Sequence, residues 1–359
     1  MNSPQVPHFP AAQSKFYNEL KGRVDAYFQE QQAKTTGNGR LYRKAAIISF
    51  CFVAIYATLI FIYLPAFLSL VLCILLGITV AGIGFNVMHD GGHKSFSQSK
   101  TWNALAANSL DFLGASSFMW KTKHNLVHHT YTNIDGIDDD MNVMPWLRLT
   151  TNQKKYPHHR FQHYYFIIFY SFLYFVWVGI LDFLKYFSKK VGPFPIASMK
   201  WKDQIIFWGS KFCFLFVFVL LPLYEKGIKS YAIGFSIFMA TTGIIISLVF
   251  QLAHIVDEAE FPKMKPNVQQ MQDEWAVHQI KTTANFSTQN SWITWYIGGL
   301  NFQIEHHLFP RISHVHYPEI SKIVKDTSQH FGIRYQEYPT LFAAIAAHVK
   351  ILKRMGTTN

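Results

Sequence analysis

The chain has 359 residues, of which 50% are apolar, 17% aromatic and 15% charged, and its formal net charge is +12. A soluble domain usually carries about 25% charged residues. Here the charges are absent from several long apolar runs, which excludes an ordinary soluble domain and predicts an integral membrane protein. The basic residues flank those runs and form no basic domain of their own, which argues against nucleic-acid binding.

The first 43 residues are predicted to form a cytoplasmic segment ahead of the membrane domain. Within residues 14–32, four apolar side chains recur at helical spacing, namely Phe16, Leu20, Val24 and Phe28. This spacing predicts a short amphipathic helix that lies before the membrane. Arg40, Arg43 and Lys44 then form a basic collar at the start of the first apolar run.

Residues 45–88 contain no charged side chain. This run is long enough for two helices of about 20 residues, each of which crosses a hydrocarbon core of about 30 Å. We expect these spans at about 45–66 and 68–88, with Pro65 at the turn. Because the second span ends immediately before His89, that histidine should lie at the membrane surface, on the same side as the basic collar.

Two histidine clusters follow the second span. They are His89-Asp90-Gly91-Gly92-His93 and His124-Asn125-Leu126-Val127-His128-His129. Histidines four residues apart share one face of a helix, and neutral imidazole is the commonest metal ligand in proteins. Between the clusters, residues 103–120 are mildly apolar but interrupted by polar side chains. We expect an interfacial or buried helix there, not a span.

Three more apolar runs follow, at 164–181, 205–224 and 231–253. If all histidine clusters bind one metal centre, an even number of crossings must separate the second cluster from the third. We therefore predict that a helix at about 164–184, which is short and rich in Tyr and Phe, lies in the interface. The other two runs form a second hairpin, joined at residues 225–229. Lys211, inside the third span, is interpreted as snorkelling to the surface.

A third cluster completes the pattern. Gln303, His306 and His307 stand at positions i, i+3 and i+4, and His254 ends the fourth span. Lysines are abundant in the segments that flank the clusters, whereas the opposite loops have only Lys226 and Lys229. The positive-inside rule therefore places the clusters in the cytoplasm. The membrane domain is expected to cover residues 44–335, followed by a cytoplasmic tail at 336–359.

Together these features predict an all-α integral membrane protein. It has four transmembrane helices in two hairpins, at about 45–66, 68–88, 205–224 and 231–253, and a cytoplasmic helical cap that carries a di-metal histidine site. Eight histidines are too many for one ion, since a zinc ion usually takes four ligands or fewer. Imidazole suits zinc, copper, iron and nickel, and sequence spacing does not choose among them. The eight are His89, His93, His124, His128, His129, His254, His306 and His307.

The three histidine boxes and their flanking residues resemble those of the membrane fatty acid desaturases. The boxes are HDGGH, HNLVHH and QIEHH, and the flanks are HHTYTN, GGLNFQIEHHLFP and ISHVHY. The resemblance covers residues from about 40 to 335. The glutamine that opens the third box is similar to the front-end branch, which adds a double bond between an existing one and the carboxyl end. The resemblance implies a non-haem di-iron centre that activates dioxygen and removes two hydrogens from an acyl chain.

Carried over box by box, the resemblance implies that the iron ligands are the seven histidines of the three boxes. They are His89, His93, His124, His128, His129, His306 and His307. Gln303 stands where many relatives have histidine, and it either binds iron or holds a water. His254 stands at the family's extra ligand position, and His278 is a weaker candidate. Four carboxylates could orient the imidazoles: Asp90, Asp138, Asp139 and Glu305.

The implied chemistry needs no separate catalytic acid or base, because an unactivated methylene has no acidic proton and the metal performs the difficult step. It does need a substrate and an electron donor. The substrate would be an acyl chain on coenzyme A or on a membrane lipid. The sequence lacks the His-Pro-Gly-Gly motif of a fused cytochrome domain. We therefore expect electrons from a separate ferredoxin- or cytochrome-like carrier with its reductase, docked on the basic cytoplasmic face.

Two alternatives remain at this stage. A related di-iron hydroxylase or other oxygenase could carry the same boxes, but its product would gain oxygen instead of losing two hydrogens. A non-enzymatic metal-binding membrane protein or transporter is the other alternative. A transporter is expected to place polar groups at mid-membrane depth, whereas these clusters lie at the ends of the spans.

Overall fold

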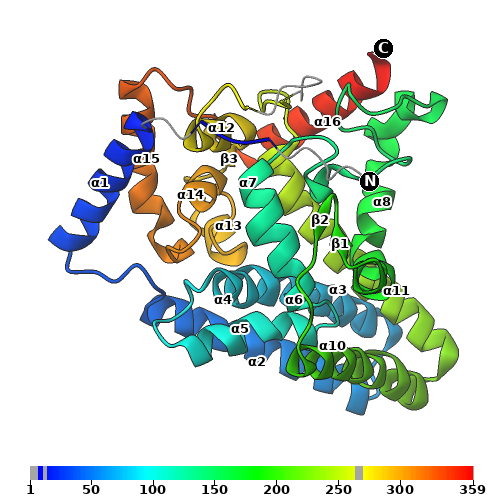
Figure 1. The fold of residues 1–359 in the computed structure, drawn as a ribbon. Helices are drawn as coiled ribbons and strands as arrows, with labels where there is room; N and C mark the ends of the chain where they lie inside the picture. Colours follow the sequence, from blue (N-terminus) through cyan, green and yellow to red (C-terminus); the bar gives the residue numbers. More distant parts are fainter. Residues whose placement is uncertain (1–6, 11–13, 263–269, 359) are drawn as a thin grey trace.

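The computed structural model describes residues 7–10, 14–262 and 270–358, and it is mostly helical (Figure 1). Four continuous helical stretches are long and apolar enough to cross a membrane: Gly39–Phe61, Ala66–His93, Pro157–Ser188 and Trp201–His254. Their exposed aromatic and aliphatic side chains suit a lipid environment, because water would not tolerate so much contiguous apolar surface. The chain is an integral membrane protein.

The first hairpin consists of α2 (Gly39–Phe61) and α3 (Ala66–Ile83). Asn38 caps α2 by accepting a hydrogen bond from the backbone N–H of Arg40 at 2.9 Å. Pro65 lies in the turn, as predicted, immediately before α3. The helix continues from α3 through the π-helical turn η1 (Gly84–Met88) into α4 (His89–His93). The first histidine box is therefore the end of a membrane helix.

The second hairpin consists of α10 (Trp201–Phe214), η6 (Leu215–Leu220) and α11 (Leu221–His254). The chain is helical on both sides of Gly227, where the backbone leaves helical geometry with φ 70° and ψ 164°. Phe218 and Phe238, on opposite sides of that glycine, stack with ring centroids 5.8 Å apart. The chain therefore reverses at Gly227, within the segment predicted to join the two spans.

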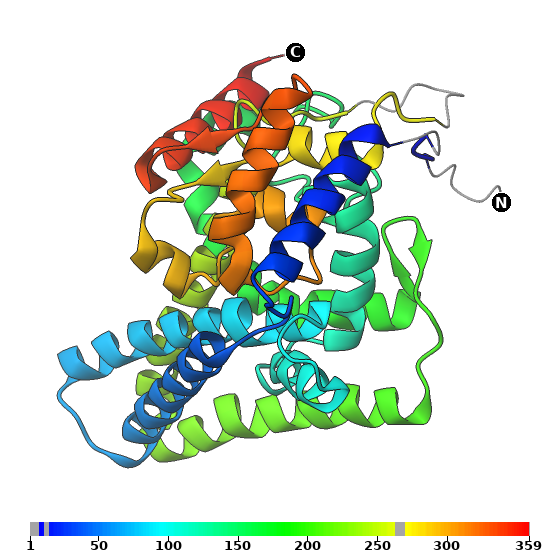
Figure 2. The same ribbon diagram turned by 90° about the vertical axis from the view of Figure 1, so that its left-hand side faces the viewer.

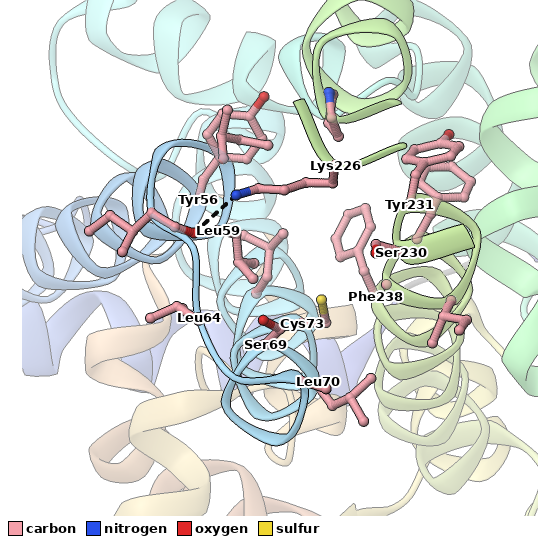
Figure 3. Close-up of a pocket in the computed structure, with 18 of the residues that line it drawn as sticks. Tyr56, Leu59, Leu64, Ser69, Leu70, Cys73, Lys226, Ser230, Tyr231 and Phe238 are labelled. Atoms are coloured by element: carbon pink, nitrogen blue, oxygen red, sulfur yellow. Dashed lines mark hydrogen bonds between the residues drawn. The ribbon is translucent and has the colours of Figure 1, made fainter. Parts of the chain in front are cut away.

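The tips of the two hairpins meet at the end away from the histidines. Lys226 Nζ donates to the carbonyl oxygen of Ile62 at 3.0 Å, and a largely apolar cavity of about 430 Å³ lies between the tips (Figure 3). Cys73 lines this cavity and stands 16 residues before His89. At about 1.5 Å per residue, the cavity is about 24 Å from the first box, so it is separate from the histidine site.

The third apolar stretch is longer than the run that predicted it. It comprises η4 (Pro157–Phe161), α8 (Gln162–Val176), η5 (Trp177–Leu181) and α9 (Asp182–Ser188), and α8 packs along α11. Lys185 Nζ lies 2.8 Å from Asp139 Oδ2, in the acidic loop beside the second box, so the chain returns to the histidine side. The stretch is itself long and apolar enough to cross a membrane, so its expected placement in the interface remains a prediction.

Lys211 does not snorkel to the surface as expected. Its Nζ atom lies 2.8 Å from Asp182 Oδ2 and also donates to the carbonyl oxygens of Gly114 at 2.6 Å and Val178 at 3.3 Å. The side chains of Lys211 and Asp182 are 9% and 1% exposed. A buried charge requires a partner and further hydrogen bonds, and both are present here. The pair ties α9 and α10 to the turn that follows α5 (Lys100–Phe112).

A helical cap covers the histidine end of the membrane helices (Figure 2). Its longer helices are α1 (Lys15–Glu30), α12 (Trp275–Thr282), α15 (Tyr317–His330) and α16 (Leu341–Thr357), and its shorter elements are α13 (Ser291–Tyr296), α14 (Gln303–Leu308), η3 (Asp139–Met141) and η7 (His314–His316). Among the described residues, two small two-stranded sheets accompany the helices. β1 (Lys190–Val191) pairs antiparallel with β2 (Phe194–Pro195), and β3 (Asn285–Phe286) pairs parallel with β4 (Glu337–Tyr338).

The amphipathic helix α1 forms where predicted, and its four apolar side chains are buried. They pack in one core with α12, α14 and α15, and Figure 2 shows α1 alongside α15. The apolar face of α1 therefore packs against the other helices of the cap. The tail is likewise part of the cap, because α16 packs on α8 and Arg148 Nη1 donates to the carbonyl oxygen of Met355 at 2.8 Å.

Candidate metal centre

Five helical elements bring histidines together at one buried point. His89 and His93 come from α4, His124 and His128 from η2 (Lys121–His128), His254 from the end of α11, and His306 and His307 from α14. His129 begins α7 (His129–Tyr131). In a π-helix the backbone hydrogen bonds run from i to i+5, so η2 is wound less tightly than an α-helix. This winding brings His124 and His129, five residues apart, to an Nε2–Nε2 distance of 3.2 Å.

The histidines form two adjacent groups. One group holds His89, His93, His124 and His306, the other holds His128, His254 and His307, and within each group the potential ligand atoms lie within 4.8 Å of one another. Nitrogen ligands on opposite sides of a zinc-sized ion would be about 4.2 Å apart, so each group has the dimensions of a metal site. His129 lies between the groups, with its ring centroid 4.6 Å from that of His306 and 4.4 Å from that of His307.

Hydrogen bonds at Nδ1 orient three of the imidazoles. Nδ1 of His128 donates to Asp138 Oδ2 at 3.0 Å, and Nδ1 of His307 donates to Gln279 Oε1 at 2.8 Å. Nδ1 of His306 lies 3.1 Å from the hydroxyl of Tyr317. The Nε2 atoms of these same three rings are buried without a hydrogen-bond partner. A buried polar atom normally has a partner, and metal-binding histidines are typically held by a hydrogen bond at the ring nitrogen that faces away from the metal.

The electrostatic environment keeps most of these rings neutral. Burial lowers the pKa of four imidazoles well below the ordinary value, those of His124, His129, His306 and His307. Burial alone would also lower the pKa of His128, but the charges of Asp138 and Asp140 outweigh it and raise that pKa. A neutral imidazole offers a free lone pair to a metal ion. The donor set, its spacing and its unpaired Nε2 atoms therefore fit a pair of nitrogen-ligated ions.

All nine residues predicted as ligands are buried in this cluster, and Gln303 is among them. Gln303 Nε2 lies 3.0 Å from His254 Nε2, beside the second group. His278, the weaker candidate, is buried but belongs to neither group; its ring packs against Phe9 with centroids 5.1 Å apart. The structure thus brings together the eight histidines and the glutamine, and it leaves His278 outside.

The four carboxylates expected to orient imidazoles have different hydrogen-bond partners. Asp138 bonds His128, as expected. Asp139 pairs with Lys185, and Glu305 accepts hydrogen bonds from Asn285 and Tyr335. Asp90 bonds Ser313 Oγ at 2.7 Å and His314 Nδ1 at 2.9 Å. Among the described residues, Asp90, Asp139 and Glu305 therefore form no hydrogen bond with a histidine of the two groups.

Sequence reasoning missed the two other orienting residues, Gln279 and Tyr317. Gln279 also accepts a hydrogen bond from Thr132 Oγ1 at 2.9 Å, and Thr132 Oγ1 bonds the carbonyl oxygen of His128 at 2.7 Å. This chain of contacts connects the second and third boxes through α12. The position of each residue in the sequence could have pointed to it. Gln279 adjoins the weaker candidate His278 on α12, and Tyr317 ends the flank ISHVHY.

The glycines of the first box allow close approach of two neighbours. A Cβ atom on Gly91 would lie 2.5 Å from the backbone nitrogen of Ala107 in α5, and one on Gly92 would collide with the ring of Trp120. Trp120 in turn stacks on His124 with centroids 4.5 Å apart and is 5% exposed. Trp120 therefore lines the histidine cluster, whereas Trp146 and Trp292 are 55% and 81% exposed and suit the interface.

Comparison with known proteins agrees with this site. Residues 64–339, which include all three boxes and His254, match the family described as fatty acid desaturase. The chain belongs to the fatty acid desaturase family. It is accordingly an oxidoreductase of lipid metabolism, and the histidine groups are its candidate metal site.

Desaturases similar to this chain match it over nearly its whole length. The sn-1 linoleoyl-lipid 6-desaturase of Synechocystis sp. is 38% identical over 96% of each chain, and that of Arthrospira platensis is 36% identical over 95% of this chain and 92% of its own. The acyl-lipid (8-3)-desaturase of Physcomitrium patens is 35% identical over 97% of this chain and 73% of its own.

Proposed function

We propose that this desaturase acts on an acyl chain held in a membrane lipid and inserts a cis double bond on the carboxyl side of an existing one. The substrate class is supported by the relatives named above, whose names give lipid-linked acyl chains. The position of the new double bond is supported by Gln303, because a glutamine that opens the third box is similar to the front-end branch. The overall reaction removes two hydrogens from adjacent methylenes. Dioxygen, two electrons and two protons are consumed, and two waters are formed.

We propose two iron ions as the resident metals. His89, His93, His124 and His306 would hold one ion, and His128, His254 and His307 would hold the other. His129 lies between them, and Gln303 binds the second ion or holds a water beside it. When bound, the irons supply the activation of dioxygen that breaks an unactivated C–H bond. The observation that carries this proposal is the division of the buried histidines into two adjacent groups.

The protein's own residues prepare that chemistry. Asp138, Gln279 and Tyr317 fix the orientation of three imidazoles and leave Nε2 of each turned into the cluster. Burial keeps water away from the site and favours the neutral form of most of the rings, whose lone pairs are then free for a metal. Trp120, stacked on His124, presents an apolar surface beside the first group. An acyl methylene can approach such a surface without desolvating a polar side chain.

Expression in a host that is fed linoleic acid tests the reaction. We expect a lipid-linked product with one additional double bond between the existing ones and the carboxyl end, located by mass spectrometry of the derivatised chain. A host that expresses the His306→Ala variant is the control. An alcohol product would support the oxygenase alternative instead, and a double bond on the methyl side would contradict the front-end assignment.

We further propose that the histidine side faces the cytoplasm. Exposed lysines gather on that side, among them Lys94, Lys121, Lys154, Lys190 and Lys202, whereas Lys226 and Lys229 lie at the opposite hairpin tips. The positive-inside rule supports this orientation. Lys123 lies in the second histidine-box helix on the same side, but it is paired with Asp140 at 2.5 Å and is less available to a partner.

An acidic electron carrier is proposed to dock on this basic face. Turnover with a purified, separate carrier should therefore slow roughly ten-fold as salt rises from about 20 to 300 mM, because screening weakens electrostatic steering. Steady-state rates at limiting carrier concentration measure the effect. A chemically reduced sample, which needs no carrier, is the control and should show no such dependence. Carrier-driven turnover that is insensitive to salt would exclude the electrostatic dock.

A further inference from the structure

A second cavity, of about 480 Å³, opens beside the first turn of α2. Three cationic side chains contribute to its wall, those of Arg40, Arg43 and Lys44, together with hydroxyl and amide groups of the segment 288–294. None of the described residues that line it is acidic. The cavity therefore combines positive charge with neutral hydrogen-bonding groups, a combination that suits a phosphate-like anion.

The cations of this cavity are not neutralised by neighbouring carboxylates. Neither Arg40 nor Arg43 has an ion pair among the residues that the structure describes, and both side chains are exposed. Lys44 is 5% exposed, and its Nζ atom donates to the carbonyl oxygen of Trp295 at 3.1 Å and lies 2.7 Å from His314 Nε2. Asp90 lies behind His314 and offsets one charge at most, so the cavity keeps an excess of positive charge.

The position of the cavity favours a ligand from the membrane over a soluble ligand. The first apolar span begins at Ala45, immediately after the three cations. The opposite wall belongs to α13, a helix in which no residue is buried and whose Trp292 is 81% exposed. Ile47 in the cavity wall and Phe50, further along α2, are 47% and 73% exposed and suit the lipid phase. Exposed tryptophan beside cationic residues marks the depth of lipid headgroups.

We propose that this cavity binds the phosphate of an anionic membrane phospholipid, with Arg40 and Arg43 as its principal contacts. The acyl chains of that lipid would run down the exposed face of α2 past Phe50. Such a lipid would join α2 to α13. α13 is connected to the third box, because Asn301 Nδ2 donates to Thr294 Oγ1 at 2.9 Å. This proposal concerns binding alone and does not depend on the reaction proposed above.

Native mass spectrometry of the purified full-length protein tests the proposal with phosphatidylglycerol as the probe. We expect a one-to-one adduct and a higher melting temperature with phosphatidylglycerol, and neither with phosphatidylcholine. Each arginine near a lipid phosphate contributes about five-fold in affinity. The Arg40→Gln/Arg43→Gln variant should therefore bind about 25-fold more weakly. Both side chains are exposed and without ion-pair partners in the described part of the chain, so this variant should fold normally.

A double variant with the same loss of charge serves as the matched control. Arg160 and Lys202 are also exposed and lie beside exposed aromatic rings, but they do not line the cavity. Arg160→Gln/Lys202→Gln should change the affinity by less than about two-fold if the cavity is the site. Equal loss in both variants, or equal binding of phosphatidylcholine, would overturn the proposal. Equal stabilisation by millimolar inorganic phosphate would show that a free anion, not a lipid, is the ligand.

Discussion

Replacing either His306 or His307 by alanine is expected to abolish desaturation, and each replacement should remove a different metal ion. The two side chains are neighbours on α14, yet they belong to different groups, because successive residues of a helix point about 100° apart. Loss of a residue that only orients a ligand typically costs 10- to 100-fold. Loss of a ligand itself should therefore reduce turnover by more than about 100-fold.

Product formation in membranes and the iron content of the purified variants measure this prediction. We expect iron to fall from about two ions per chain towards one in each variant. His330→Ala is the matched control, since His330 is exposed at the end of α15 and remote from both groups in the described structure. Either variant retaining more than about a tenth of normal turnover would remove its histidine from the ligand set.

The second large effect is expected at the buried pair of Lys211 and Asp182. Replacing Lys211 by methionine leaves the Asp182 carboxylate, 1% exposed, without its cation. Breaking such a pair from one side typically costs about 3–5 kcal/mol. We therefore expect the free energy of unfolding in detergent to fall by about 3–5 kcal/mol, measured by denaturant titration monitored through tryptophan fluorescence.

A double variant, Lys211→Met/Asp182→Leu, separates the cost of an unpaired buried charge from the cost of altered packing. It should be more stable than Lys211→Met alone, because no buried charge remains. It should still be less stable than the wild type, since the backbone N–H of Ser116, which donates to Asp182 Oδ2 at 2.7 Å, loses its acceptor. Lys229→Met, at an exposed position, is the control. A Lys211→Met variant destabilised by less than about 1 kcal/mol would contradict the structural importance of the pair.

The elements that the sequence predicted well are those set by local periodicity. Helical spacing correctly indicated the buried face of α1, and the absence of charge over residues 45–88 indicated the first hairpin. What packs against the α1 face was not predictable, because a periodic pattern shows that a face is buried and says nothing of its neighbour. The neighbour, α15, lies about 300 residues further along the chain.

The histidine cluster was predictable, but most of its supports were not. Asp90 and Glu305 adjoin ligand histidines in sequence, but a neighbour on a helix points about 100° away, and both carboxylates bond other groups. Gln279 and Tyr317 reach the cluster only through tertiary packing of α12 and α15. Lys211 was misread for the same reason, since its partner Asp182 comes from a different helix.

Anomalous X-ray diffraction at the iron edge, from crystals of the purified holoenzyme, tests the central claim most directly. We predict two separate iron peaks within the histidine cluster, one among His89, His93, His124 and His306 and the other among His128, His254 and His307. A single peak, or peaks outside these groups, would contradict the assignment of a di-iron centre to this arrangement.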